Sequence, residues 1–198
     1  MLLAITNRKL CQEDFFQRME KIAQGRPDGI LLREKDLEEN LLVQYAEKCK
    51  SIAEEYQVPF GINGSVSVAE KLKISWLHFS VEAFRNFNKE EYPFVKKTGV
   101  SIHSVEEAVE MEQLGASYLI AGHVFLTDCK KGLPARGLDF LQSVCNRVCI
   151  PIFAIGGITK DRTKEVLGRG ASGYCVMSHF MTCQEPKAEV EAFKNMKK

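Results

Sequence analysis

Residues 118–131, with the sequence YLIAGHVFLTDCKK, contain the pattern that recurs along this chain. Four apolar residues predict a buried strand, and Gly122 and His123 follow it directly. The polar loop beyond them carries Thr127 and Lys130. A histidine at the end of a buried strand is a candidate acid or base, and it is also commonly a structural residue of the core or its rim. The other strands are needed to decide between these two interpretations.

The same unit, an apolar run followed by a polar loop and an amphipathic segment, occurs eight times. Helical spacing predicts helices over residues 13–24, 37–56, 68–72, 138–148 and 160–169. A further helix begins at Ser104, where Glu107 is placed for a capping box, a less regular segment follows the fourth strand, and a polar helix ends the chain. The expected strands are residues 2–6, 29–32, 60–62, 76–79, 99–102, 118–121, 151–155 and 173–177.

Eight strand and helix units without a linker predict one domain, residues 1–198, of the α/β class. Eight parallel strands are the number that closes a (β/α)₈ TIM barrel, and 198 residues lie at the lower end of the usual range for this fold. A doubly wound open sheet is the alternative. It is disfavoured because no GxGxxG pattern opens the first helix.

The composition excludes several classes of partner. The chain has 27 Lys and Arg residues against 26 Asp and Glu residues, a formal net charge of +1, so no overall attraction to nucleic acid or to an anionic membrane is expected. It has no apolar run of about 18 residues and no signal-peptide pattern, so we expect a cytoplasmic protein. Its seven cysteines show neither a CxxC pair nor zinc spacing, which predicts free thiols and no metal site.

Polar side chains gather where the expected strands end, which is the functional end of a barrel. All four histidines lie at or near this end, although His78, between two apolar neighbours, favours a structural role. The candidates are Arg33 and Lys35 after the second strand, Asn63 after the third, Ser101 and His103 at the fifth, His123, Thr127 and Lys130 after the sixth, and Ser178 and His179 after the eighth.

Gly156 and Gly157 follow the seventh strand and precede an expected helix. Backbone N–H groups of glycines can approach an anion closely, and a helix N-terminus adds partial positive charge. Barrels often bind phosphate between the loops after strands seven and eight, where Ser178 would supply the opposite side. The pair therefore predicts a phosphate site, with tight packing as the alternative explanation of the two glycines.

Five segments also resemble a known family. GVSIHS (99–104), GHVFLTDCKKG (122–132), PARGLDFL (134–141), PIFAIGGIT (151–159) and YCVMS (174–178) are similar to the thiamin phosphate synthase superfamily, and LLREK (31–35) extends the likeness. Within it, GHVFxT followed by CK is similar to the thiazole tautomerase branch, the TenI proteins. The fold that this resemblance implies is the (β/α)₈ barrel.

Two departures from the synthase pattern favour the tautomerase branch. Synthases hold Mg²⁺ with carboxylates at two places where this chain has Gly64 and Ala83. The resemblance then implies an isomerase, without metal or organic cofactor, that aromatises an exocyclic carboxythiazole ethyl phosphate, with His123 carrying the proton.

The same resemblance assigns the ligand contacts and leaves other functions open. The phosphate would lie on Gly156, Gly157 and Ser178, and the substrate carboxylate near Arg33, Lys35 or Ser101. A phosphorylated thiazole is the implied partner, and a homo-oligomer is possible. A phospho-ligand-binding or regulatory protein without catalysis, and a thiamin phosphate synthase, remain alternatives.

Overall fold

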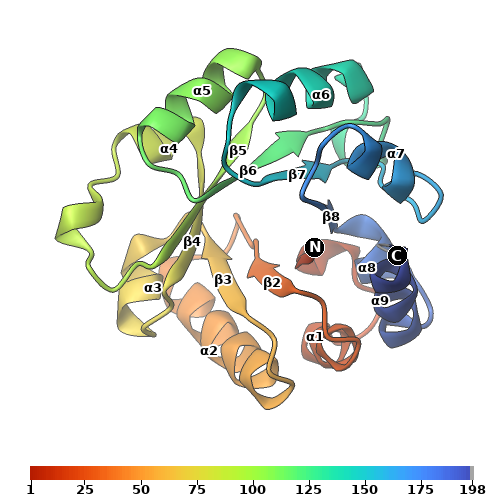
Figure 1. Cartoon of the computed structure of the whole chain (residues 1–198). Coiled ribbons are helices and arrows are strands. Elements are labelled where there is room, and N and C mark those ends of the chain that lie inside the picture. Colours follow the sequence, from red (N-terminus) through yellow and green to blue (C-terminus); the bar gives the residue numbers. More distant parts are fainter. Residues whose placement is uncertain (197–198) are drawn as a thin grey trace.

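A computed structural model of the chain describes residues 1–196. Its strands run parallel and pair in chain order, and β1 also pairs with β8, so the sheet closes into a barrel (Figure 1). The predicted single-domain (β/α)₈ barrel is confirmed, and the doubly wound alternative is wrong. The strands are β1 (Leu2–Ile5), β2 (Gly29–Leu32), β3 (Phe60–Asn63), β4 (Trp76–Ser80), β5 (Lys97–Ile102), β6 (Tyr118–Gly122), β7 (Ile152–Ile155) and β8 (Gly173–Val176).

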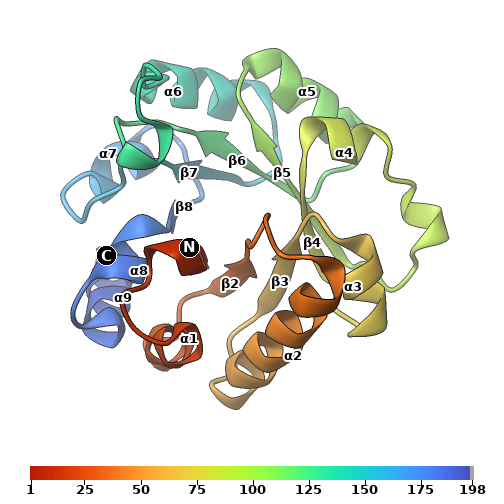
Figure 2. The same ribbon diagram turned by 180° about the vertical axis from the view of Figure 1, so that it is seen from behind.

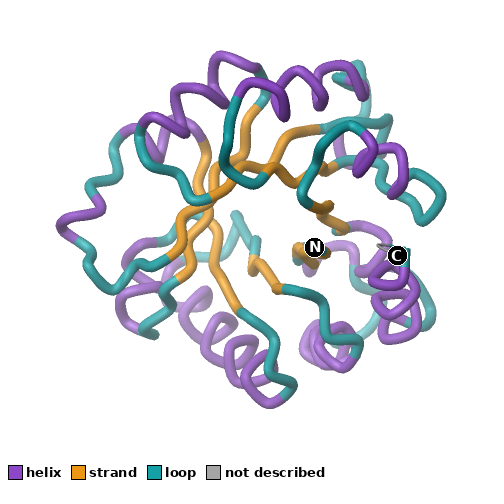
Figure 3. The backbone as a smooth tube through the Cα atoms, viewed as in Figure 1, coloured by secondary structure: helices purple, strands orange, loops and turns teal. Residues whose placement is uncertain are grey.

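The helices form an outer ring around the strands, as Figures 1 and 2 show from opposite sides. Loops at each strand end carry the chain outward to the next helix (Figure 3). The α-helices are α1 (Phe15–Gln24), α2 (Glu39–Glu55), α3 (Val66–Lys71), α4 (Val81–Arg85), α5 (Val105–Gln113), α6 (Gly137–Arg147), α7 (Thr163–Gly168), α8 (Ser178–Thr182) and α9 (Pro186–Asn195). Short 3₁₀ turns are η1 (Arg8–Leu10), η2 (Lys89–Glu91) and η3 (Asp128–Lys130).

Helix ends follow local side-chain chemistry. The Ser104 hydroxyl accepts a hydrogen bond from the Glu107 N–H at 3.0 Å, as the capping-box pattern predicted. The reciprocal bond differs, because the Glu107 carboxylate accepts from the N–H of His103 instead of that of Ser104. The cap therefore also fixes the backbone of a candidate site residue.

The helix expected over residues 160–169 is shorter than predicted. The Thr163 hydroxyl donates to the carbonyl of Lys160 at 2.7 Å, and residues 160–162 form a turn, so α7 begins only at Thr163. Its N-terminus therefore lies farther along the chain from Gly157 than the sequence pattern indicated. The expected C-terminal helix is divided, with α8 directly after β8 and α9 packed beside α1.

The apolar core has two layers, because alternate strand residues face opposite sides of the sheet. The outer layer lies between the strands and the helices and holds most buried side chains. The inner layer fills the barrel with strand residues only: Leu3, Ile5, Leu31, Trp76, Tyr118, Ile120, Phe153 and Cys175. A barrel interior packed in this way is a core and not a pore. Within residues 1–196 no helix is long and apolar enough to cross a membrane.

Candidate active site at the carboxyl ends of the strands

The structure places the predicted residues at the rim where the parallel strands end. Because the sheet closes, strands that are distant in sequence deliver their side chains to one mouth. These residues are Arg33 and Lys35 after β2, Asn63 ending β3, Ser101 in β5 and His103 after it, His123, Thr127 and Lys130 after β6, Gly156 and Gly157 after β7, and Ser178 and His179 after β8.

The loop that carries Arg33 and Lys35 is anchored by the residue between them. Glu34 is buried, and its Oε1 accepts hydrogen bonds from the Thr6 hydroxyl at 2.7 Å and from the Arg8 N–H at 3.0 Å. The Thr6 hydroxyl in turn accepts from the Arg33 N–H at 3.0 Å. A buried carboxylate needs partners of this kind, so the anchor holds both cations at the rim. The sequence analysis missed Glu34, since an acid between two bases resembles an exposed charged loop.

Lys35 is near two other positive charges at the mouth. Partial burial lowers the pKa of Lys35, and the nearby charges of Arg33 and Lys130 lower it further. Lys130 comes from the other side of the mouth, where its N–H donates to the Thr127 carbonyl at 3.0 Å and forms the turn η3. The mouth is therefore a local cation cluster in a chain whose net charge is close to zero.

Both rim histidines contact the loop that leaves β6. The Nδ1 of His103 lies 2.9 Å from the carbonyl oxygen of Gly122, which makes Nδ1 the donor and leaves Nε2 for a ligand. The Nε2 of His123 lies 3.4 Å from the carbonyl of Leu133, and this side chain is buried. Each imidazole is thus oriented by a backbone carbonyl of the β6–α6 segment.

The Gly156–Gly157 turn packs tightly against the same segment. Both residues have positive φ, +98° and +63°, a conformation that other residues rarely adopt. A Cβ on Gly156 would lie 2.3 Å from the Cβ of His123, and one on Gly157 would lie 2.5 Å from the carbonyl oxygen of Leu126. Tight packing therefore accounts for both glycines, and the phosphate site predicted for them stays a prediction.

Ser178 and His179 are adjacent but differ in their surroundings. Ser178 is the first residue of the short helix α8, beside the end of β8, which is where barrels commonly bind phosphate. The Nε2 of His179 lies 2.6 Å from the Glu189 carboxylate on α9, and the centre of its ring lies 5.6 Å from that of Phe193. The structure therefore engages His179 in the contact between α8 and α9.

The two positions after β3 and β4 that carry Mg²⁺ carboxylates in the synthase pattern have no side-chain oxygen in this chain. Asn63 donates from its side chain to the His78 carbonyl at 3.2 Å, and Gly64 and Ala83 supply no side-chain oxygen. Within residues 1–196 no group of three His, Cys, Asp or Glu side chains is placed to share a metal ion. The residues of this chain do not fit the Mg²⁺ site that the synthase pattern implies.

His78 is fully buried inside the barrel, so the structural role predicted for it agrees with its position. Burial lowers its pKa to about 3, with smaller contributions from Arg33 and Lys35. Its ring contacts Tyr118 and Ser101. The sequence analysis did not find this contact of three strands, because it depends on which alternate residues face inward.

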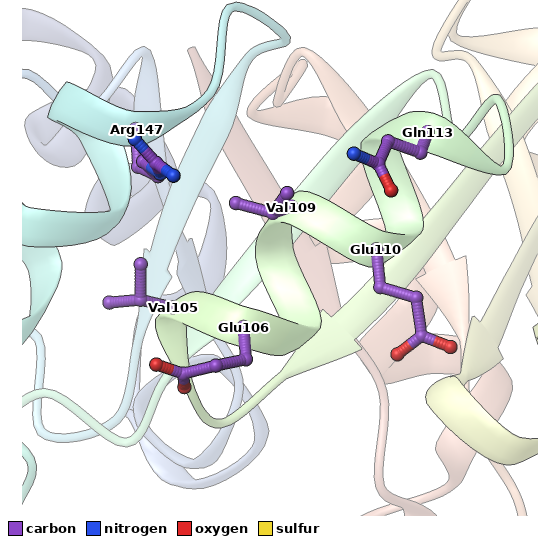
Figure 4. Close-up of a pocket in the computed structure, with 6 residues that line it drawn as sticks. All are labelled: Val105, Glu106, Val109, Glu110, Gln113 and Arg147. Atoms are coloured by element: carbon purple, nitrogen blue, oxygen red, sulfur yellow. The ribbon is translucent and has the colours of Figure 1, made fainter.

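A separate hollow lies outside the barrel, on the flank of α5 that faces α6 (Figure 4). It has a volume of about 310 Å³ and is lined by Val105 and Val109 of α5 and by Arg147 of α6, among others. The residues that line it belong to α5 and α6, and none of the candidate side chains is among them. The hollow is therefore not part of the site at the mouth.

Residues 2–180 match the family model described as thiamine monophosphate synthase. The chain belongs to this family. It is 32% identical over 188 residues to the thiamine-phosphate synthase of Clostridium acetobutylicum, covering 94% of this chain and 89% of that protein. It is 31% identical to thiamine-phosphate synthase 2 of Streptococcus pneumoniae, with 97% and 92% covered. A solved thiamine phosphate pyrophosphorylase of Pyrococcus furiosus superposes with a TM-score of 0.85 at 29% identity, covering 98% and 94% of the two chains.

These family relatives correct the activity that the sequence analysis expected. Curated relatives about 30% identical over most of the chain are thiamine-phosphate synthases, which are transferases, so the assignment as an isomerase was wrong. The narrower resemblance rested on the loop after β6 and on Gly64 and Ala83. The family membership itself was predicted correctly.

Proposed function

We propose that this protein is a thiamine-phosphate synthase, a transferase that joins a pyrimidine diphosphate to a thiazole phosphate. The observation that carries the proposal is the cluster of Arg33, Lys35 and Lys130 at the mouth. Like charges that repel one another are unfavourable in the free protein, and a polyanionic ligand relieves that repulsion. The names of relatives that share nearly the whole chain support the same class.

The reaction requires stabilisation of a leaving group. A bond forms between the pyrimidine and the thiazole, the bond between the pyrimidine and its diphosphate breaks, and the electron pair stays on the departing pyrophosphate. Arg33, Lys35 and Lys130 stabilise the charge that develops on this group. The thiazole phosphate occupies the opposite side of the mouth, at the Gly156–Gly157 turn and Ser178.

The other predicted residues, except His179, are assigned to the space between the two anion subsites. Asn63 and Ser101 offer hydrogen-bond donors, and His103 offers its free Nε2. The His123 ring and the Thr127 carbonyl form hydrogen bonds within the β6–α6 segment, which carries Lys130 toward the diphosphate. The proton-carrier role of His123 belonged to the isomerase assignment and is not retained.

A second function has one observation in its favour. Gly64 and Ala83 remove the carboxylates of the synthase pattern, so the chain cannot hold Mg²⁺ as that pattern requires. A protein that binds the phosphorylated ligands without joining them would keep the cations and lose the metal site. The two functions share ligands and differ only in turnover.

One assay separates them. Purified protein is mixed with pyrimidine diphosphate and thiazole phosphate, with Mg²⁺ or with EDTA, and thiamine phosphate and released pyrophosphate are measured. The synthase proposal expects both products in equal amounts, and Lys130→Gln should reduce their rate while the neighbouring exposed Lys131→Gln does not. Binding of both substrates by calorimetry without either product would instead establish the binding protein.

A further inference from the structure

Four side chains form a hydrogen-bonded chain through the barrel interior. The indole N–H of Trp76 donates to the Tyr118 hydroxyl at 2.9 Å, and that hydroxyl lies 3.0 Å from Nδ1 of His78. On the other side of the ring, Nε2 of His78 lies 2.8 Å from the Ser101 hydroxyl. The chain runs from the amino ends of β4 and β6 toward the mouth, where Ser101 is partly exposed.

Such a chain is unusual in a place where barrels generally stack branched aliphatic residues. Neighbouring strands leave room for it with glycines. A Cβ on Gly99 would lie 2.0 Å from the Tyr118 ring, and one on Gly61 would lie 2.5 Å from the Trp76 ring. The edge of Tyr118 also packs against Phe153, with ring centres 5.5 Å apart. The two aromatic rings are therefore held in fixed positions.

The direction of each hydrogen bond follows from counting hydrogens. Trp76 can only donate, so the Tyr118 oxygen accepts from it. Burial raises the pKa of Tyr118, so its hydroxyl keeps its single hydrogen, which is directed to Nδ1 of His78. Neutral His78 then carries its hydrogen on Nε2 and donates it to the Ser101 oxygen.

The opposite tautomer of His78 leaves a buried group unsatisfied. With a hydrogen on Nδ1, Tyr118 would accept two hydrogen bonds, and its own hydrogen would have no acceptor among residues 1–196. A buried donor without a partner is markedly unfavourable. Protonation of both ring nitrogens is also disfavoured, because burial keeps the pKa of His78 at about 3. The Ser101 hydroxyl therefore accepts from inside the barrel, and its own hydrogen is left for the mouth.

We propose that Trp76, Tyr118 and His78 are positioning residues that commit the Ser101 hydroxyl to donate a hydrogen bond to an anionic oxygen of the ligand. Arg33 and Lys35 follow β2 at the same rim, and their charges act on His78. This inference rests on the proposed function for the ligand, an oxygen of the diphosphate. The order of donors and acceptors does not depend on that function, because it follows from the three hydrogen bonds and from neutral Tyr118 and His78.

The first test needs no variant and no ligand. Nitrogen-15 NMR of the histidines in the full-length protein distinguishes a protonated Nε2 from a protonated Nδ1. His78 should show the Nε2–H tautomer without titrating near neutral pH, and His78→Gln assigns its signals by their loss. A hydrogen on Nδ1 in the parent protein would overturn the proposal.

The second test measures binding of inorganic pyrophosphate by calorimetry. Ser101→Ala should weaken it about tenfold, the loss of one hydrogen bond to a charged group, and Ser101→Thr should largely restore it. Tyr118→Phe should weaken it as well and give a mixture of His78 tautomers in the NMR spectrum. The matched control is Tyr174→Phe, which removes another buried hydroxyl. That hydroxyl donates to the Phe193 carbonyl at 2.6 Å and does not lie at the mouth.

The outcomes separate this inference from the proposed function. Unchanged pyrophosphate binding by Ser101→Ala would overturn the donor role, even if Tyr118→Phe fails to fold. If Tyr118→Phe and Tyr174→Phe lose the same amount of pyrophosphate affinity and the His78 tautomer is unchanged, the four hydrogen-bonded side chains have only a structural role. That result would overturn the proposal. Absence of synthase turnover, with the tautomer and the Ser101 effect as expected, would reject the synthase and leave the positioning role in place.

Discussion

The two sides of the barrel mouth are built by different means. On the side of β4 and β5, side chains form the site: Ser101 is oriented by His78, and the cations of the β2 loop lie nearby. On the side of β7, the backbone forms the site, because Gly156 and Gly157 allow the loop after β6 to approach within a distance that no Cβ permits. The first side depends on which functional groups are present, whereas the second depends on the absence of side chains.

This contrast predicts different responses to substitution. We call the side of β4 and β5, with the cations of the β2 loop, the side-chain wall. Removing a functional group there should weaken one interaction and leave the fold intact. Adding a single methyl group on the glycine side should displace a whole loop, since close-packed backbone cannot yield locally. Substitutions on the two sides should therefore differ in size and in what else they disturb.

The largest effect is expected from Gly157→Ala. The added Cβ meets the Leu126 carbonyl, and the positive φ of this position costs about 1–2 kcal/mol for a residue with a side chain. Displacement of residues 123–126 should then abolish binding of thiazole phosphate, measured by calorimetry. Gly115→Ala is the control, because its φ is also positive, +85°, while its Cβ meets nothing within 4 Å. Parental affinity in Gly157→Ala would contradict the placement of the phosphate.

A smaller effect is expected on the side-chain wall. Arg33→Gln removes one cation but leaves the Glu34 anchor, so the protein should melt near the parental temperature. Pyrophosphate affinity should fall by about tenfold or more, because hydrogen bonds to charged groups contribute roughly 1.5–3 kcal/mol. Arg85→Gln serves as the control, since Arg85 pairs with Glu110 on the surface. Equal affinity in the parent and Arg33→Gln would remove the cation cluster from the site.

The pH dependence of pyrophosphate binding should be milder still. An ordinary lysine has a pKa of about 10.4. The pKa of Lys35 is lowered in the free protein, so this side chain loses its charge at a lower pH. The bound anion favours the charged form of Lys35, so binding should raise the pKa of Lys35 and be accompanied by uptake of a proton. The affinity for pyrophosphate should therefore fall by a few fold as the pH rises. Lys35→Arg, which keeps its charge, should bind without this loss. A pH profile identical in both proteins would show that Lys35 does not contact the anion.

The smallest effect is expected from His179→Gln. This side chain pairs with Glu189 between α8 and α9 and is 43% exposed, so its loss should cost about 0–1 kcal/mol of stability by urea unfolding. Affinity for thiazole phosphate should not change. A clear loss of affinity would return His179 to the ligand site, where the sequence analysis had placed it.

Sequence patterns predicted the fold well because each strand and helix has its own local signal. All eight apolar runs became strands, and the capping box at Ser104 starts a helix. The start of α7 was missed because the bond from Thr163 to Lys160 stabilises a turn that helical spacing does not reveal. The family was also recognisable from its loops, whereas the narrower branch was inferred from Gly64 and Ala83 and the relatives did not support it.

The sequence by itself determined the order of strands, the one rim that holds the polar residues and the family. Only the tertiary structure decided that Glu34 is a buried anchor, that His179 turns to α9, and that His78 connects Tyr118 with Ser101. The physical reason is that strand alternation and helix periodicity are properties of neighbouring residues. A hydrogen bond between β4, β5 and β6 exists only once the barrel has closed and set the register between them.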